Sequence, residues 1–343
     1  RHVGSCAPGP QMASATNIVW MGSHLLSSEA DMLRLHDAKE RLDEVRLEAD
    51  IYTITPVFTN GSEAAMVQLC DGTLVRARIE ATGRLTIEDT GLKWPQVCST
   101  VLSCDQGLIG LTERFKLYLD TRELASNVTS LCLHSSFLLV TTLDHQLLTL
   151  QLSQLSSCQT AATASTGQRR VERGSRLVVS VPHGSKTVLQ MPRGNMEVIH
   201  PRSLSIVLLA AHLDSGHFRE AFMLARTQRI NLNLLVDHDT VRFLASVSEV
   251  VEQICRPDYL TIFIADLLEE DVCTTLYADQ YKSKEGKKAT VSSDKVSRVC
   301  AVLRKELEKK DAEKYLLPIL ATYVRDGKNL LPEIFMGSSE GMY

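Results

Sequence analysis

The hydrophobic residues of this chain change their spacing near residue 200. Before that point apolar and polar residues alternate in short runs, the period of two that places successive side chains on opposite faces of a β-strand. After Pro201 the apolar residues recur at intervals of three and four, which places them on one face of a helix. The pattern therefore predicts two domains, a β domain over residues 1–200 and an α domain over residues 201–343.

Four pairs of short apolar runs in the first domain predict β-hairpins. In the clearest pair, Asp71-Gly72 separates residues 65–70 from residues 73–79, and Asp-Gly readily adopts the positive φ values of a tight turn. The successive turns lie about 42, 31 and 40 residues apart, which suits four-stranded propeller blades and leaves an antiparallel sandwich as the alternative. The other three turns are predicted at residues 112–114, 143–145 and 183–185.

One stretch of the β domain does not fit the strand pattern. Residues 153–170 read SQLSSCQTAATASTGQRR, a polar, low-complexity composition that buries little apolar surface. We expect this stretch to be a flexible loop inserted between strands.

The second domain predicts pairs of antiparallel helices. The segment Asp214-Ser215-Gly216 separates the first two predicted helices. Glycine and small polar residues commonly end helices. Residues 281–293 are predicted to be a charged linker, and the last eight residues a frayed end. Successive pairs with one apolar face each suggest a TPR-like α-solenoid. The predicted apolar faces are Leu204, Val207, Leu208 and Ala211, then Phe218, Ala221, Phe222 and Ala225, with further helices over 240–254, 258–268, 294–309 and 312–325.

Composition and charge exclude several classes of protein. The chain has 343 residues, 44% of them hydrophobic, and 37 Lys plus Arg against 41 Asp plus Glu, a net charge of −4. The composition is therefore not that of a disordered chain. The net charge gives no overall indication of binding to nucleic acid or to anionic membranes. No apolar run approaches the roughly 20 residues that cross a membrane. The first residues lack an initiator Met and a signal-peptide pattern, so we expect the chain to begin inside a longer protein.

The sequence offers little for catalysis. The nine cysteines include no C-x-x-C pair, which favours free thiols in a reducing compartment over disulfides or zinc. Phosphate binding, metal binding and nucleophilic catalysis often depend on residues at fixed spacings. The sequence contains no phosphate-binding glycine loop, no H-E-x-x-H metal motif and no G-x-S-x-G nucleophile motif. We therefore predict that the chain is not an enzyme, with no catalytic residues, no cofactor and no bound metal.

Two histidine-containing groups are weak candidates for a metal site. His212, Asp214 and His217 straddle the predicted helix break, where polar residues solvate and cap the backbone in any case. The second group is Asp237-His238-Asp239, in which Asp239 directly precedes the predicted helix start at Thr240. That is the usual place of an N-cap residue. For both groups we favour a role in capping and solvating helix ends over a role in binding a metal.

Four arginines form the one candidate for contact with phosphate. Arg169, Arg170, Arg173 and Arg176 lie within eight residues, enough for a phosphate or RNA contact surface if their guanidinium groups converge. A solvated loop leading into a strand is the favoured alternative, because no aromatic residues interleave the charges.

Several long strings of the chain resemble the largest, scaffold subunit of the Elongator complex. Residues 107–142, which contain GLTERFKLYLDTRELASNVTSLCLHSSFLLVTT, resemble strands that close its second WD40-type propeller, and residues 171–202 resemble its last propeller strands and the entry to the helical arch. Residues 219–239 resemble the first helix pair, and residues 267–277 continue the match. The strings are collinear and together span roughly residues 100–325, which is a specific resemblance.

The resemblance implies a non-catalytic scaffold that supports modification of the wobble uridine of tRNA. Its implied partners are the catalytic subunit, which resembles a radical S-adenosylmethionine enzyme joined to an acetyltransferase domain, and a WD40 propeller subunit. It further implies a cytoplasmic and also nuclear location, and no membrane partner. Against the family the chain lacks the first propeller, the first blades of the second, and the C-terminal region that carries homodimerisation and a basic tRNA-contacting segment. Contact of this segment with tRNA is therefore expected to be indirect or weak.

Two other functions compete with the Elongator scaffold. In vesicle-coat and transport scaffolds, too, a propeller is followed by a solenoid. The architecture alone therefore does not discriminate between such a scaffold and the Elongator scaffold. An RNA-binding module would act through the four arginines and would show a steep dependence of affinity on salt.

Overall fold

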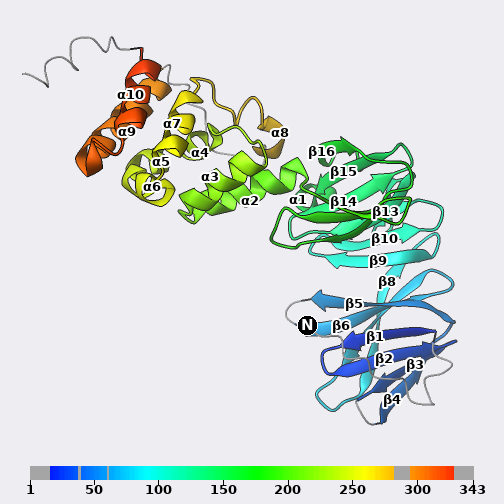
Figure 1. Ribbon diagram of the computed structural model, residues 1–343. Helices are drawn as coiled ribbons and strands as arrows, with labels where there is room; N and C mark the ends of the chain where they lie inside the picture. The colour runs from blue at the N-terminus through cyan, green and yellow to red at the C-terminus, as the bar shows by residue number, and fades with distance from the viewer. Residues whose placement is uncertain (1–15, 38–39, 60–61, 282–293, 328–343) are drawn as a thin grey trace, which may run out of the picture. The chain divides into compact units, whose positions relative to one another are not determined.

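The computed structural model describes residues 16–37, 40–59, 62–281 and 294–327. They fall into two compact units, the described residues of 16–182 with 188–198, and those of 183–187 with 199–327. β-Strands build the first unit and helices dominate the second (Figure 1). The predicted linker beyond Tyr281 and the predicted frayed end lie outside the described residues.

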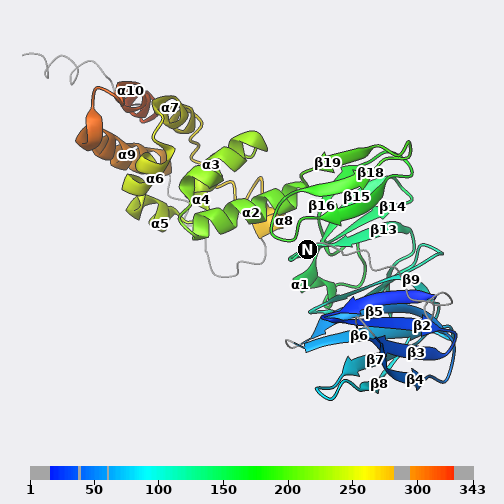
Figure 2. The ribbon, with the colours of Figure 1, turned by 60° about the horizontal axis from the view of Figure 1, so that its bottom comes forward.

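The strands form five antiparallel sheets, numbered I to V along the chain. Sheets I to IV have four strands each, always in sequence order from one edge to the other, and sheet V has three. Sheet I contains β1 (Asn17–Met21), β2 (His24–Glu29), β3 (Met32–His36) and β4 (Arg41–Arg46); sheet II β5 (Ile51–Thr59), β6 (Ser62–Leu69), β7 (Thr73–Ile79) and β8 (Leu85–Lys93); sheet III β9 (Cys98–Cys104), β10 (Gly107–Thr112), β11 (Leu117–Leu119) and β12 (Arg122–Ala125); sheet IV β13 (Val128–Leu133), β14 (Phe137–Thr142), β15 (Gln146–Gln151) and β16 (Ser165–Arg170); and sheet V β17 (Arg176–Ser180), β18 (Thr187–Gln190) and β19 (Met196–Ile199). Figure 2 shows β18 and β19 of sheet V beside β15 and β16 of sheet IV.

Strand β6 buries both of its faces, each in a different core. Ala65 and Val67 belong to the core between sheets I and II. Ala64 and Met66 of the same strand belong to the core between sheets II and III. The period of two distributes alternate side chains to the two faces, so sheet II is covered on both sides at the apolar run Ala64–Val67 of this strand.

The sheets are arranged as propeller blades and not as the two facing layers of a sandwich. Three of the four consecutive pairs of sheets contact through their first strands, β1 with β5, β5 with β9 and β13 with β17, and sheets III and IV contact through β10 and β13, as in blades placed around a common axis. The four predicted hairpins are confirmed as β6–β7, β10–β11, β14–β15 and β17–β18. The expected propeller architecture is therefore present.

Residues 153–170 differ from the expected inserted loop. They include the end of a short helix, α1 (Leu152–Leu155), and the whole of β16, which pairs with β15. Leu155, Ala161 and Ala164 are buried in the core between sheets III and IV, and the guanidinium of Arg122 donates to the carbonyls of Leu155 and Cys158. Composition did not indicate that this stretch is ordered. Three widely spaced apolar residues of small or medium size are enough to anchor it to the core of the neighbouring sheets.

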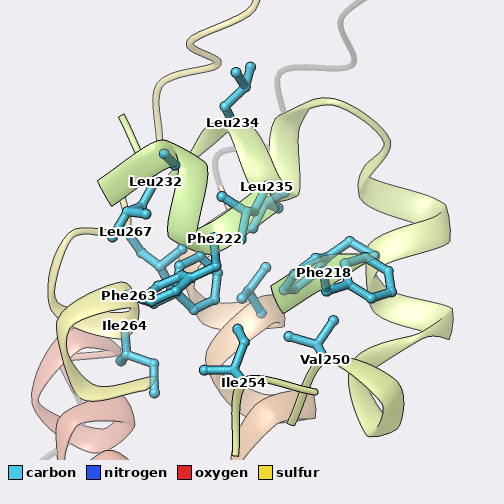
Figure 3. Packing of buried hydrophobic residues seen from close by; sticks show 14 of the residues in the cluster. Phe218, Phe222, Leu232, Leu234, Leu235, Val250, Ile254, Phe263, Ile264 and Leu267 are labelled. Carbon is cyan, nitrogen blue, oxygen red and sulfur yellow. The ribbon is translucent and has the colours of Figure 1, made fainter. Parts of the chain in front are cut away.

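The second unit stacks helices in antiparallel pairs. The pairs are α2 with α3, α6 with α7, and α9 with α10; α3 then packs on α6, α6 on α9, and α7 on α10. One continuous hydrophobic core runs through them, with Phe222 and Phe263 near its centre (Figure 3). This is the expected solenoid. The helices are α2 (Arg202–Asp214), α3 (Phe218–Thr227), α4 (Leu234–Asp237), α5 (Thr240–Ala245), α6 (Val247–Ile254), α7 (Pro257–Ala265), α8 (Ala278–Tyr281), α9 (Lys295–Asp311) and α10 (Leu316–Arg325).

Two helix predictions were wrong in detail. Residues 240–254 form two helices, α5 and α6, separated at Ser246. On α2 the buried face includes Ile206, Leu209 and Leu213, whereas Ala211 of the predicted face is exposed. This helix is apolar nearly all round, so its spacing did not identify the face that packs. On α3 the predicted face is confirmed residue by residue.

Candidate functional site

The four candidate arginines lie on three neighbouring elements of the sheet unit. Arg169 and Arg170 end β16, Arg173 lies in the turn that follows, and Arg176 begins β17. All four are exposed. Because Arg169 and Arg170 are adjacent on a strand, their side chains leave opposite faces. The structure therefore keeps the four charges close along the chain but does not gather them all on one face.

Neutralising these arginines tests whether they contact RNA. If they contact tRNA, changing all four to glutamine reduces the slope of log affinity for tRNA against log salt by about 0.7 to 0.9 for each phosphate that the variant no longer touches. Filter binding at several salt concentrations measures the slope. Arg84→Gln with Arg193→Gln, two exposed arginines in turns elsewhere in the sheet unit, is the control. An unchanged slope in the fourfold variant would contradict the contact.

Asp214 of the first histidine group makes a structural hydrogen bond. Oδ1 of Asp214 lies 2.7 Å from Nε2 of His238, whose side chain is only 3% exposed. The rings of His212 and His217 lie 6.2 Å apart, at the turn where Gly216 adopts a φ of +74°. Within the described ranges no three His, Cys, Asp or Glu side chains are grouped to hold a metal. Asp214 and His238 instead connect α2 to the end of α4.

The second histidine group contains a buried ion pair and a helix cap. Nζ of Lys295 donates to both carboxylate oxygens of Asp237, at 2.9 and 3.2 Å, and the side chains are 10% and 1% exposed. Burial raises the pKa of the Asp237 carboxyl, against the lowering effect of Lys295 and of the Val272 amide. Asp239 accepts a hydrogen bond from the Arg242 amide at 3.2 Å, which confirms the predicted N-cap of α5.

Sequence patterns did not reveal the polar residues that join the helix pairs. Oε1 of Gln253 on α6 accepts from the Phe218 amide at 2.8 Å, and its Nε2 donates to the Gly216 carbonyl at 2.8 Å. Gln253 thereby satisfies both ends of the turn between α2 and α3. Lys295 joins α9 to α4 in the same manner. Neither residue carries a sequence signal, because its partners are 25 to 58 positions away.

Two buried cysteines are poor nucleophiles. The eight cysteines of the described ranges are free thiols, as predicted. Burial raises the pKa of Cys98 to about 12 and that of Cys300 to about 11, so neither thiol ionises near neutral pH, and the thiolate is the nucleophile. Among the described helices none is long and apolar enough to span a membrane. What the helical unit offers is an extended surface of stacked helices.

Two family models match successive parts of the chain. The model of the ELP1 N-terminal second beta-propeller matches residues 14–178. The model of the ELP1 alpha-solenoid matches residues 202–336. The first match covers sheets I to IV and ends within β17, and the second covers the stacked helices α2 to α10, in the same order along the chain.

Curated relatives from distant organisms match across both parts. The chain is 41% identical over 249 residues to the putative elongator complex protein 1 of Xenopus laevis, covering 68% of this chain and 21% of that protein. It is 33% identical over 290 residues to elongator complex protein 1 of Oryctolagus cuniculus, covering 80% and 22%, respectively. For the Schizosaccharomyces pombe protein the identity is 32% over 273 residues, covering 77% and 22%. The chain thus spans about a fifth of the length of these relatives, and it belongs to the ELP1 family of Elongator complex proteins.

Proposed function

We propose that this chain is part of a non-catalytic scaffold that holds other Elongator subunits together while the complex modifies the wobble uridine of tRNA. The observation that carries the proposal is the succession of propeller sheets and stacked helix pairs in a chain of the ELP1 family. Such stacks present long surfaces to which several partners bind at once. The proposed partners are the catalytic subunit and the WD40 subunit.

Family membership favours this function over the vesicle-coat alternative. The coat hypothesis depended on the order of a propeller and a solenoid alone, which unrelated functions share. The sequence matches extend through both units, and the relatives from frog, rabbit and fission yeast all carry the Elongator name.

Deleting the helical unit from the full-length protein tests the proposed scaffold. We expect the deletion of residues 202–327 to remove the catalytic subunit from affinity-purified complex and to abolish wobble-uridine modification in tRNA, measured by mass spectrometry of nucleosides. A full-length protein with Val241→Ser, a change at an exposed position of α5, is the control and should retain both. Full recovery of the catalytic subunit with the deleted protein would contradict the proposal.

A further inference from the structure

An aromatic ring lies beside two arginines on the outer surface of the helical unit. Tyr259 of α7 packs partly buried against the core, with its ring centroid 5.3 Å from that of Phe222 on α3. The guanidinium carbon of Arg226 lies 4.5 Å from the Tyr259 centroid, and that of Arg256 lies 4.2 Å from it. Both cations therefore interact with one ring and lie within about 9 Å of each other.

The two arginines differ in their charge partners. Arg256 donates to both carboxylate oxygens of Asp258, at 3.0 and 2.7 Å. Arg226 is exposed, and within the described ranges its guanidinium contacts the rings of Phe222 and Tyr259. Stacking on a ring leaves the N–H donors in the guanidinium plane able to reach an acceptor from outside, and the ring already orients them.

Apolar side chains flank the arginines on both helices. Met223 lies one turn before Arg226 on α3, and Ile262 lies one turn after Tyr259 on α7, spacings that make the residues of each pair neighbours. Met223 and Ile262 are each 39% exposed. Arginine, tyrosine and methionine are enriched in the cores of protein interfaces. We call Met223, Arg226, Arg256, Tyr259 and Ile262 the Arg–Tyr surface.

We propose that the Arg–Tyr surface binds an acidic segment of a partner protein. A carboxylate of the segment would accept hydrogen bonds from Arg226, and a neighbouring apolar side chain would cover Met223 and Ile262. Protein is favoured over nucleic acid because Asp258 already neutralises Arg256, whereas nucleic-acid sites gather several uncompensated cations against phosphates. The inference rests on the proposed scaffold function and specifies one of its docking surfaces.

A peptide array tests the proposal without requiring the complex to assemble. The 343-residue chain, fluorescently labelled, is applied to overlapping peptides from the other Elongator subunits, and bound peptides are remeasured in solution by anisotropy. We expect binding peptides to contain Asp or Glu beside a large apolar residue. Arg226→Glu should weaken their binding by at least about tenfold, because it places like charges together. Arg298→Glu, at an exposed arginine of α9, should leave it unchanged.

The outcomes that overturn the proposal are distinct from failure of the scaffold function. Absence of acidic binding peptides, or equal affinity of the Arg226→Glu and Arg298→Glu chains, rejects the surface even if the full-length protein purifies with its complex. Binding of tRNA that Arg226→Glu abolishes, without an acidic peptide ligand, rejects it in favour of nucleic acid. Arg226→Ala, with the far-ultraviolet circular dichroism of both variants, establishes whether weaker binding reflects a change of fold.

Discussion

Replacing Lys295 with methionine is expected to destabilise the helical unit by about 3 to 5 kcal/mol, because it leaves the Asp237 carboxylate buried without its cation. Asp237 is 1% exposed, so water cannot take the place of the ammonium group. Lys295 also donates to the Glu270 carbonyl at 2.7 Å, a second bond that the variant cannot form. Urea denaturation followed by circular dichroism at the helical signal measures the change.

Two control variants separate the buried charge from other effects. Lys309→Met changes the same residue type in the same helix, but its partner Glu306 is 3.7 Å away and Lys309 is 74% exposed; we expect less than about 0.5 kcal/mol. Adding Asp237→Asn to Lys295→Met removes the charge while keeping an acceptor for the Val272 amide, and should recover about half of the deficit. If Lys295→Met and Lys309→Met were equally mild, the buried pair would not stabilise the stack.

The loss in free energy of unfolding caused by Lys295→Met should also depend on pH. Burial raises the pKa of the Asp237 carboxyl above its ordinary 3.8, and Lys295 opposes that rise, so its removal raises the pKa further. A carboxyl with a raised folded pKa binds a proton more tightly in the folded state than in the unfolded state, and acid then favours folding. The deficit should shrink as the pH falls from about 8 to about 5.

Replacing Gly72 with alanine is expected to destabilise the sheet unit by about 3 kcal/mol, from backbone strain together with a clash. Gly72 follows Asp71 in the hairpin between β6 and β7 and has a φ of +90°. A Cβ there would clash with the Trp94 carbonyl oxygen. That carbonyl cannot retreat easily, because the Trp94 amide donates to the Gly72 carbonyl at 2.9 Å.

Gly83→Ala is the matched control for this clash. Gly83 also has a positive φ, +77°, but an added Cβ would meet no atom within 4 Å, so we expect only the conformational cost of about 1 kcal/mol. Both tryptophans of the chain, Trp20 and Trp94, lie in or between the sheets, so their fluorescence during urea denaturation reports on this unit. Equal destabilisation by the two changes would show that the Trp94 contact is unimportant.

Local patterns predicted the elements whose signals lie within a few residues. The Asp71-Gly72 hairpin follows from the chemistry of a two-residue turn, and the buried face of α3 follows from a clear contrast of apolar and polar positions. The Asp239 cap was predictable because its partner, the Arg242 amide, lies three residues away. The prediction of a flexible loop at 153–170 was wrong because composition does not report a nearby core that accepts Leu155 and Ala161.

The sequence by itself determined two successive architectures, their approximate order of elements, and the resemblance to an Elongator scaffold. Only the tertiary structure decided which face of α2 is buried, that Asp237 pairs with Lys295, and that Arg226 and Arg256 share one tyrosine ring. The physical reason is the separation along the sequence between the residues that interact. Turns, caps and amphipathic periods depend on neighbours along the chain, whereas a pair such as Asp237 and Lys295, 58 residues apart, exists only once packing has brought separate helices together.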